Sequence, residues 1–187
     1  LLYLLQSLLN TNTDQSNNAV ATEEKKSMGN SDNDDSNDNK TRGGKHKKER
    51  RDKLTLIFAA TRHHVDFLTY LIRSSGIDAT SIYGTMDLEA RKTNLASFRN
   101  GDTPVLVVTD VAARGIDVPL IHTVIHHSFP SSAKLFVHRS GRAARAGRVG
   151  YCLSLVEPDE MPYMVELHLF LGRKLTTSKI ISENSSE

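Results

Sequence analysis

The stretch that decides the fold is Val105-Leu-Val-Val-Thr-Asp-Val-Ala-Ala-Arg-Gly-Ile-Asp-Val-Pro119. It opens with an uninterrupted aliphatic run of strand length and passes directly into a polar loop. Such runs are typical of parallel strands covered on both faces, and ligands of open α/β sheets bind at the carboxyl ends of these strands. The loop therefore predicts a binding edge, with these candidate residues: Thr109, Asp110, Arg114, Gly115 and Asp117. The alternative, an ordinary turn in which Asp110 caps a helix beginning at Val111, leaves the later charged residues unexplained.

On both sides of this stretch, short apolar runs alternate with longer segments of helical pattern. The runs predict strands at residues 54–59, 79–83, 105–108, 123–126 and 150–156. The longer segments predict helices at residues 63–74, 88–98, 133–138 and 158–170. Strands that alternate with helices in this way indicate an α/β fold with a parallel sheet.

The N-terminal run Leu1–Leu9 has leucines at helical spacing but contains Gln6 and Ser7. It is far shorter than the ~20 apolar residues of a membrane span, so we expect no membrane contact. It also lacks a basic start and a cleavage site, which argues against a signal peptide, and the missing initial Met suggests a fragment. We expect residues 1–9 to form a helix that docks on the α/β domain.

Residues 10–53 differ in composition from the rest of the chain. Residues 14–38 contain seven acidic residues and two lysines, a net charge of −5. Residues 40–53 contain eight basic residues and two acidic ones, a net charge of +6. Low hydrophobicity with biased charge predicts disorder. The basic part is equally compatible with an RNA anchor, a nuclear-targeting signal or a solvated linker. We therefore divide the chain into residues 1–9, an insertion at 10–53, a domain at 54–175 and a polar tail at 176–187.

Composition limits the remaining possibilities. The chain has 187 residues, 38% hydrophobic and 25% charged, which suits one domain with loose ends. Its one cysteine, Cys152, excludes a disulfide framework and favours a reducing, intracellular compartment; its apolar neighbours predict a place in the core. The adjacent pairs His63-His64 and His126-His127 lack the spacing of metal ligands, so no metal site is predicted.

The segment His138-Arg-Ser-Gly-Arg-Ala-Ala-Arg-Ala-Gly-Arg148 carries an arginine at every third position, with small residues between most of them. This spacing predicts arginines near one side of a helix, and the small residues allow a ligand or another domain to approach closely. Like charges on one face favour an anion, and the guanidinium fork matches phosphate oxygens. A solvated basic helix face is the less favoured alternative, because two glycines inside a helix cost ~1 kcal/mol each.

Four segments together resemble the C-terminal RecA-like domain of DEAD-box RNA helicases: Leu56–Thr61, the pattern Gly84, Arg91, Leu95 and Phe98, Val105–Pro119, and His138–Arg148. They occur in the family's order and spacing, and the resemblance covers residues 54–175. It implies a RecA-like three-layer sandwich with a mostly parallel central sheet. His138 at the head of the last segment favours the DEAD-box class over relatives that carry Gln there.

The resemblance also implies roles for residues at matching positions. Arg142 and Arg145 would be arginine fingers at the γ-phosphate of ATP, and His138 would couple ATP binding to RNA binding. Gly115 and Asp117 would also bind ATP, Asp117 near the ribose. Contacts to the RNA backbone are expected from a second set of residues: Thr61, Arg91, Thr109, Arg114 and Gly115. Gly115 belongs to both the ATP-binding set and the RNA-binding set.

The sequence contains none of the motifs of the family's first domain, such as the phosphate-binding Gly-x-x-x-x-Gly-Lys-Thr loop or Asp-Glu-Ala-Asp. ATP and Mg²⁺ would therefore be held mainly by the N-terminal RecA-like domain of the same protein, and this chain alone should not hydrolyse ATP. The alternative function is a non-catalytic RNA-binding or scaffold module with the same fold.

The arginine segment and the run Leu167–Arg173 resemble most the nucleolar branch of the family, which acts in assembly of the large ribosomal subunit. This narrower resemblance implies a nuclear, nucleolar location. It also implies pre-rRNA or other structured RNA duplexes, and pre-ribosomal proteins, as partners.

Overall fold

The computed structural model describes residues 1–3, 5–6, 54–114, 116, 118, 121–143 and 149–174. The predicted insertion at 10–53 and the predicted tail at 176–187 lie outside the described residues. So do three of the predicted site residues: Gly115, Asp117 and Arg145.

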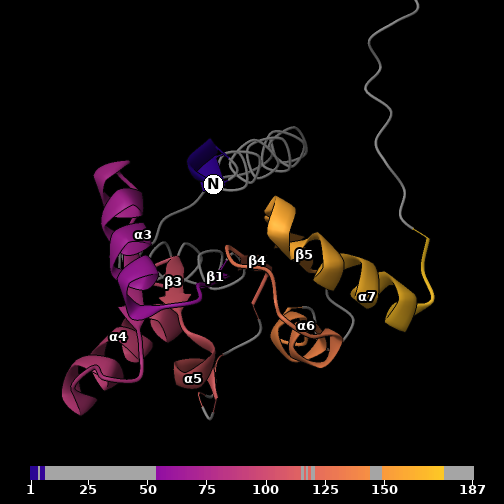
Figure 1. The fold of residues 1–187 in the computed structure, drawn as a ribbon. Coiled ribbons are helices and arrows are strands. Elements are labelled where there is room, and N and C mark those ends of the chain that lie inside the picture. Colours follow the sequence, from indigo (N-terminus) through magenta and orange to yellow (C-terminus); the bar gives the residue numbers. More distant parts are fainter. Residues whose placement is uncertain are drawn as a thin grey trace, which may run out of the picture.

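Strands and helices alternate along the described chain (Figure 1). The strands are β1 (Thr55–Phe58), β2 (Ala79–Ile82), β3 (Val105–Val108), β4 (Thr123–His126) and β5 (Tyr151–Ser154). The helices are α3 (Arg62–Ser74), α4 (Leu88–Asn100), α5 (Asp110–Ala113), α6 (Ala133–Ser140), the 3₁₀ turn η1 (Pro158–Glu160) and α7 (Met161–Leu171). The predicted helix at 158–170 is thus a 3₁₀ turn followed by an α-helix, and α5 is an element that the predicted set lacked.

The five strands form one sheet in the order β2-β3-β1-β4-β5, and every neighbouring pair is parallel. In the centre of the sheet, Thr55 of β1 pairs with Val105 of β3 on one side and with Thr123 of β4 on the other. All four residues of each of these three strands are buried. The prediction of an α/β fold with a parallel sheet is confirmed, and it follows from central strands whose two middle residues are apolar.

Alternate residues of the central strands supply two separate cores, one on each face of the sheet. Leu56 and Phe58 of β1 join the core that contains Phe98 of α4 and the alanines of α5. Ile57 of β1 joins the other core, which contains Val65 of α3. Helices therefore cover both faces, which gives three layers.

The N-terminal residues belong to the second core. Residues 2–3 and 5–6 are helical, and Leu5 is completely buried with Ile57 and the inner face of α3. Leu1 and Leu2 pack against the same core. Tyr3, in contrast, is exposed.

Local sequence signals fix the ends of α4. The Asp87 carboxylate accepts hydrogen bonds from the backbone N–H groups of Glu89 and Ala90, at 3.0 and 3.3 Å. Gly101 ends the helix with φ 76°, a left-handed conformation that glycine adopts without a Cβ penalty. These two caps set the position of α4, and so of Arg91, beside the sheet.

The predicted core position of Cys152 is wrong. It lies exposed on β5, an edge strand whose burial is much lower than that of the central strands. Its Sγ nevertheless lies 4.0 Å from Nε2 of buried His126, and burial raises the pKa of the thiol to about 11. An apolar run thus marked a strand correctly but did not distinguish the edge of the sheet from its centre.

In the described part of the chain, no helix combines the length and the apolar character that crossing a membrane requires.

Candidate functional site

The loops that follow the central strands meet at the carboxyl edge of the sheet. Thr61 follows β1, Thr109 follows β3, and the loop at Ser128 follows β4. The Ala60 N–H donates to Ser128 Oγ at 3.3 Å, which joins the loops after β1 and β4. Because β1 lies between β3 and β4, this edge brings together segments far apart in the sequence.

One side chain ties these loops to α6. Arg139 Nε and Nη2 donate to the two Asp110 carboxylate oxygens at 2.8 and 2.6 Å, and Nη1 donates to the Ser128 carbonyl oxygen at 2.8 Å. Its guanidinium carbon lies 5.0 Å from the centre of the Phe58 ring. Arg139 is only 3% exposed, so its charge is compensated inside the protein. We call Arg139, Asp110 and Ser128 the arginine clamp.

The geometry of the clamp and of the end of α6 corrects three expectations. The arginines of this segment do not share one open face, because Arg139 points inward to Asp110 and α6 ends at Ser140, before Arg142. Gly141 is the C-cap of α6 and not an interior residue, so it does not carry the interior cost assumed for it. Asp110 is also not a helix cap: it is the first residue of α5, and its carboxylate bonds to Arg139.

Arg142 and His138 remain accessible at the end of α6. His138 is exposed and Arg142 is half-buried, and Arg142 Nη2 lies 3.3 Å from His138 Nε2. Gly141 allows the chain to turn here, because a Cβ at this position would lie 3.0 Å from the Val137 carbonyl oxygen. Among the described residues, no carboxylate forms an ion pair with Arg142. Its charge is therefore available to an anion.

The predicted RNA contacts Thr61, Arg91, Thr109 and Arg114 occupy four different environments. Thr61 is exposed, and its Oγ1 caps α3 by accepting from the His64 N–H at 3.2 Å. Thr109 is the N-cap residue of α5, with no side-chain capping bond. Arg91 is half-buried, and its Nη2 donates to the Ala112 carbonyl oxygen at 2.8 Å. Arg114 is exposed directly after α5. The bond from Arg91 thus joins α4 to α5, the helix that begins after Thr109.

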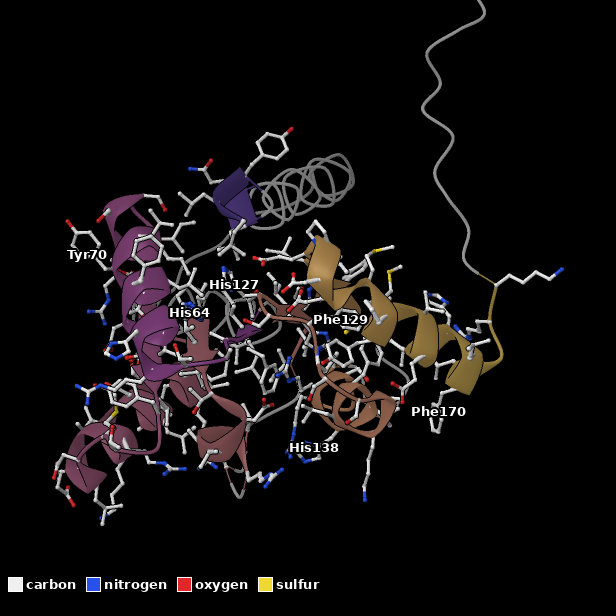
Figure 2. The ribbon with its side chains drawn as sticks, viewed as in Figure 1. His64, Tyr70, His127, Phe129, His138 and Phe170 are labelled. Carbon is white, nitrogen blue, oxygen red and sulfur yellow. The ribbon has the colours of Figure 1, made fainter. Side chains whose placement is uncertain are left out.

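The edge also borders a cavity of about 530 Å³ between the end of α5 and one face of α6. We call it the basic pocket, and its lining residues are Arg114, Ser131, Ser132, Lys134, Leu135 and His138. Figure 2 shows His138 at the side of α6 that faces α5. Of these residues, the sequence had singled out Arg114 and His138. Ser131, Ser132 and Lys134 follow no motif, and only the three-dimensional fold brings them to this edge.

A buried histidine lies behind the clamp. His126 is completely buried, its Nδ1 lies 2.9 Å from Ser154 Oγ, and its ring contacts the rings of Phe58 and Phe136. Burial above all, and then the nearby Arg139 charge, lower its pKa to about 3, while Asp110 opposes the shift. His126 is therefore neutral at physiological pH and belongs to the core.

Histidines also meet at the loop after β4, where the His64 and His127 rings lie 6.1 Å apart (Figure 2). Burial, and then the neighbouring His64, lower the pKa of His127. Within the described ranges, no three His, Cys, Asp or Glu side chains form a group that could hold a metal ion.

The fold and the site define a class of domain: a three-layer α/β domain with a parallel sheet, whose carboxyl edge carries the accessible arginines Arg114 and Arg142. The helicase conserved C-terminal domain family matches residues 41–147. The chain is 51% identical over 131 residues to the ATP-dependent RNA helicase DDX54 of Mus musculus, covering 70% of this chain and 15% of that protein.

Solved structures agree with this match. E. coli DEAD-box protein SrmB, bound to regulator of ribonuclease activity A, superposes with a TM-score of 0.64 and 31% identity, covering 73% of this chain and 84% of that one. S. cerevisiae Dbp5 bound to RNA and ADP BeF3 gives a TM-score of 0.61 at 27% identity, covering 66% of this chain and 33% of that one. The chain belongs to the helicase conserved C-terminal domain family, in its DEAD-box branch, and the predicted RecA-like fold is confirmed.

The chain covers only part of the curated relatives it matches. Its share of their length ranges from 11% to 19%. The activity, substrates and partners of these longer proteins are therefore extended to this chain only as a proposal.

Proposed function

We propose that this chain is the C-terminal RecA-like domain of an ATP-dependent DEAD-box RNA helicase, and that it supplies arginine fingers and RNA contacts to a site shared with an N-terminal domain. The observation that carries the proposal is the contrast between two arginines three residues apart. Arg139 is buried and paired with Asp110, whereas Arg142 stands at the end of α6 beside His138. An accessible guanidinium at a fixed helix end is suited to a phosphoryl group.

In this proposal, Arg142 and Arg145 reach the γ-phosphate of ATP held mainly by the N-terminal domain. There they stabilise the negative charge that spreads over the phosphoryl oxygens in the transition state. Asp117 and Gly115 lie at the ATP site, with Asp117 near the ribose, and His138 couples ATP binding to RNA binding. Mg²⁺ is held mainly by the N-terminal domain, as the resemblance to the family implies.

The RNA contacts of the proposal are directed at the sugar-phosphate backbone, so they carry little sequence information. They come from Thr61, Arg91, Thr109, Arg114 and Gly115, and the first four of these lie at the carboxyl edge of the sheet or beside α5. Closure of the two domains around ATP and RNA would bend one strand and open a short duplex locally. The similarity to a Dbp5 structure bound to RNA and ADP BeF3 supports this assignment.

The same proposal extends to the cellular role. The relatives named DDX54 and DBP10 are ATP-dependent RNA helicases that share about half of their residues with this chain over the matched region. Together with the resemblance of Leu167–Arg173 to the nucleolar branch, they support a role in ribosome biogenesis. The location would be the nucleolus, with pre-rRNA as the RNA and pre-ribosomal proteins as possible neighbours.

The test is RNA-stimulated ATP hydrolysis by this chain alone and by the longer protein that contains its own N-terminal RecA-like domain. We expect no hydrolysis by the chain alone, and RNA-stimulated hydrolysis by the longer protein. Hydrolysis by the chain alone would contradict the shared site. No hydrolysis by either protein, with RNA binding retained, would favour a non-catalytic RNA-binding module.

A further inference from the structure

We propose that the basic pocket binds a phosphate ester, and that Lys134 and Ser131, which belong to no helicase motif, are ligand-contacting residues. The proposal rests on the proposed function, because it enlarges the anion site at the same edge of the sheet. The added contacts come from Ser131 and Lys134, which lie before the arginine segment in the sequence, next to and within the first turn of α6.

The charges that line the pocket indicate an anionic ligand. Its lining includes the guanidinium of Arg114, the ammonium of Lys134 and the imidazole of His138, and none of the described residues that line it is acidic. Elsewhere on the described surface, two exposed cations have carboxylate partners: Arg62 pairs with Asp66 at 3.5 Å and Lys92 with Glu89 at 3.0 Å. No ion pair or hydrogen bond joins the Arg114 or Lys134 side chain to any described residue. Unpaired cations around one concave surface favour an anion.

The walls of the pocket are held in place before any ligand binds. One wall ends α5 at Arg114, and the other is the face of α6 that carries Lys134 and His138. The arginine clamp joins these two helices directly, since Asp110 is in α5 and Arg139 is in α6. A preformed site loses less conformational entropy on binding than one that must be ordered.

The size and lining of the pocket indicate the class of ligand. A volume of about 530 Å³ is in the range of small-molecule sites and exceeds what a single inorganic ion would fill. The serine hydroxyls of Ser131 and Ser132 donate and accept hydrogen bonds, and the Leu135 side chain provides apolar contact. A phosphate with its attached sugar matches this combination, and it can come from the RNA backbone or from ATP.

The experiment measures binding of a fluorescent single-stranded uridine oligonucleotide, and separately of a fluorescent ATP analogue, by anisotropy. The proteins are the 187-residue chain, Lys134→Ala, Ser131→Asp and the control Lys174→Ala. Lys174 is an exposed lysine after α7, so its substitution removes the same charge away from the pocket. Lys134 and Ser131 are exposed, so both variants should fold, and thermal melts check this.

We expect Lys134→Ala to weaken binding of the phosphate ligand about three- to fivefold, the effect of one partly exposed charge. If the ligand is RNA, the salt dependence should also fall by about 0.7 in slope, the loss of one phosphate contact on a single strand. Ser131→Asp, which places a negative charge in the pocket, should weaken binding at least as much. Lys174→Ala should bind like the unchanged chain.

Weaker oligonucleotide binding would assign the phosphate to RNA, and weaker binding of the ATP analogue would assign it to the nucleotide. If the chain binds RNA and both pocket variants match Lys174→Ala for both ligands, the pocket assignment is overturned and the proposed function stands. If the unchanged chain binds neither ligand, the pocket assignment is overturned, and the proposed function is decided by the hydrolysis assay on the longer protein.

Discussion

The arginine clamp and the basic pocket are built on the same two helices, and they use their cations in opposite ways. In the clamp, Arg139 is 3% exposed and its three hydrogen bonds end on Asp110 and Ser128. In the pocket, Arg114 and Lys134 are exposed, and no carboxylate of the described residues pairs with them. Residue type alone therefore does not separate a structural cation from a ligand-binding one; burial and pairing do.

The comparison also shows that the two regions depend on each other. The clamp holds α6 against α5, and this contact shapes the pocket and positions Arg142 at the helix end. Substitutions in the clamp should act first on stability, and substitutions at the accessible cations should act on ligands while the fold is retained.

The largest effect is expected at Arg142. In the longer protein with its N-terminal domain, Arg142→Ala should reduce ATP turnover by ~10³-fold, because an arginine finger stabilises the transition state. The melting temperature should change little, because Arg142 has no buried ion pair among the described residues. Steady-state ATPase assays with saturating RNA, together with thermal melts, check both parts.

The control for this variant is Arg173→Ala, which removes an exposed arginine just after α7. Its turnover should match that of the unchanged protein. Unchanged turnover in both Arg142→Ala and Arg145→Ala would rule out the arginine-finger assignment.

At Arg139, the main effect should be on stability. Arg139→Ala leaves the Asp110 carboxylate without its partner at a partly buried position, and breaking such a pair costs about 3–5 kcal/mol. Urea unfolding of the chain, with its signal from circular dichroism, measures this loss. Arg139→Ala combined with Asp110→Ala should be less destabilised than the sum of the single variants. Strict additivity would mean that the pair does not act as a clamp.

Burial of His126, and then the charge of the neighbouring Arg139, should also make stability depend on pH. The pKa of His126 is lowered from 6.5 to about 3 in the folded chain, so protons bind the unfolded chain more readily. This contribution to stability is complete above pH 6.5 and is lost as the pH falls toward 3, at up to about 1.4 kcal/mol per pH unit.

The matched variant is His126→Gln, which cannot bind this proton. Urea unfolding at neutral pH and one unit below the unfolded pKa should show a smaller acid-induced loss in the variant than in the unchanged chain. An equal loss in both proteins would show that His126 is not the acid-sensitive group.

The smallest effect is expected at Arg91. This residue is intermediate between the buried, paired Arg139 of the clamp and the exposed cations of the pocket. Its Nη2 donates to the Ala112 carbonyl oxygen, yet it is only half-buried and has no carboxylate partner among the described residues. Arg91→Ala should weaken binding of a uridine oligonucleotide a few-fold and lower the salt slope by about 0.7. Anisotropy at several salt concentrations measures both. A large loss of stability with unchanged RNA affinity would place Arg91 with the clamp.

Most of the fold followed from the sequence because the middle residues of the central strands are apolar. The predicted strands at 105–108 and 123–126 match β3 and β4 at both ends. Two features did not follow. The four-residue helix α5 is too short to show a periodic pattern, and the exposure of Cys152 depends on which strand lies at the edge.

The candidate site was predicted by residue type but not by environment. The arginine spacing located Arg139 and Arg142 correctly, yet it could not show that Arg139 pairs with an acid 29 positions earlier. The sequence did show Asp110 as an acid directly after a strand. An acid at that place was the available signal that one of the arginines could form an ion pair there. Lys134 and Ser131 carried no signal, because the pocket arises only when α5 and α6 come together.

The clamp also constrains how this sequence can change over evolutionary time. Replacing either Arg139 or Asp110 alone passes through an intermediate with an unpaired charge at the junction of two helices. Replacing both with apolar residues of similar volume can be nearly neutral. The two positions therefore form one heritable unit, expected to persist together or to be exchanged together, whereas a change at Lys134 leaves no buried charge without its partner.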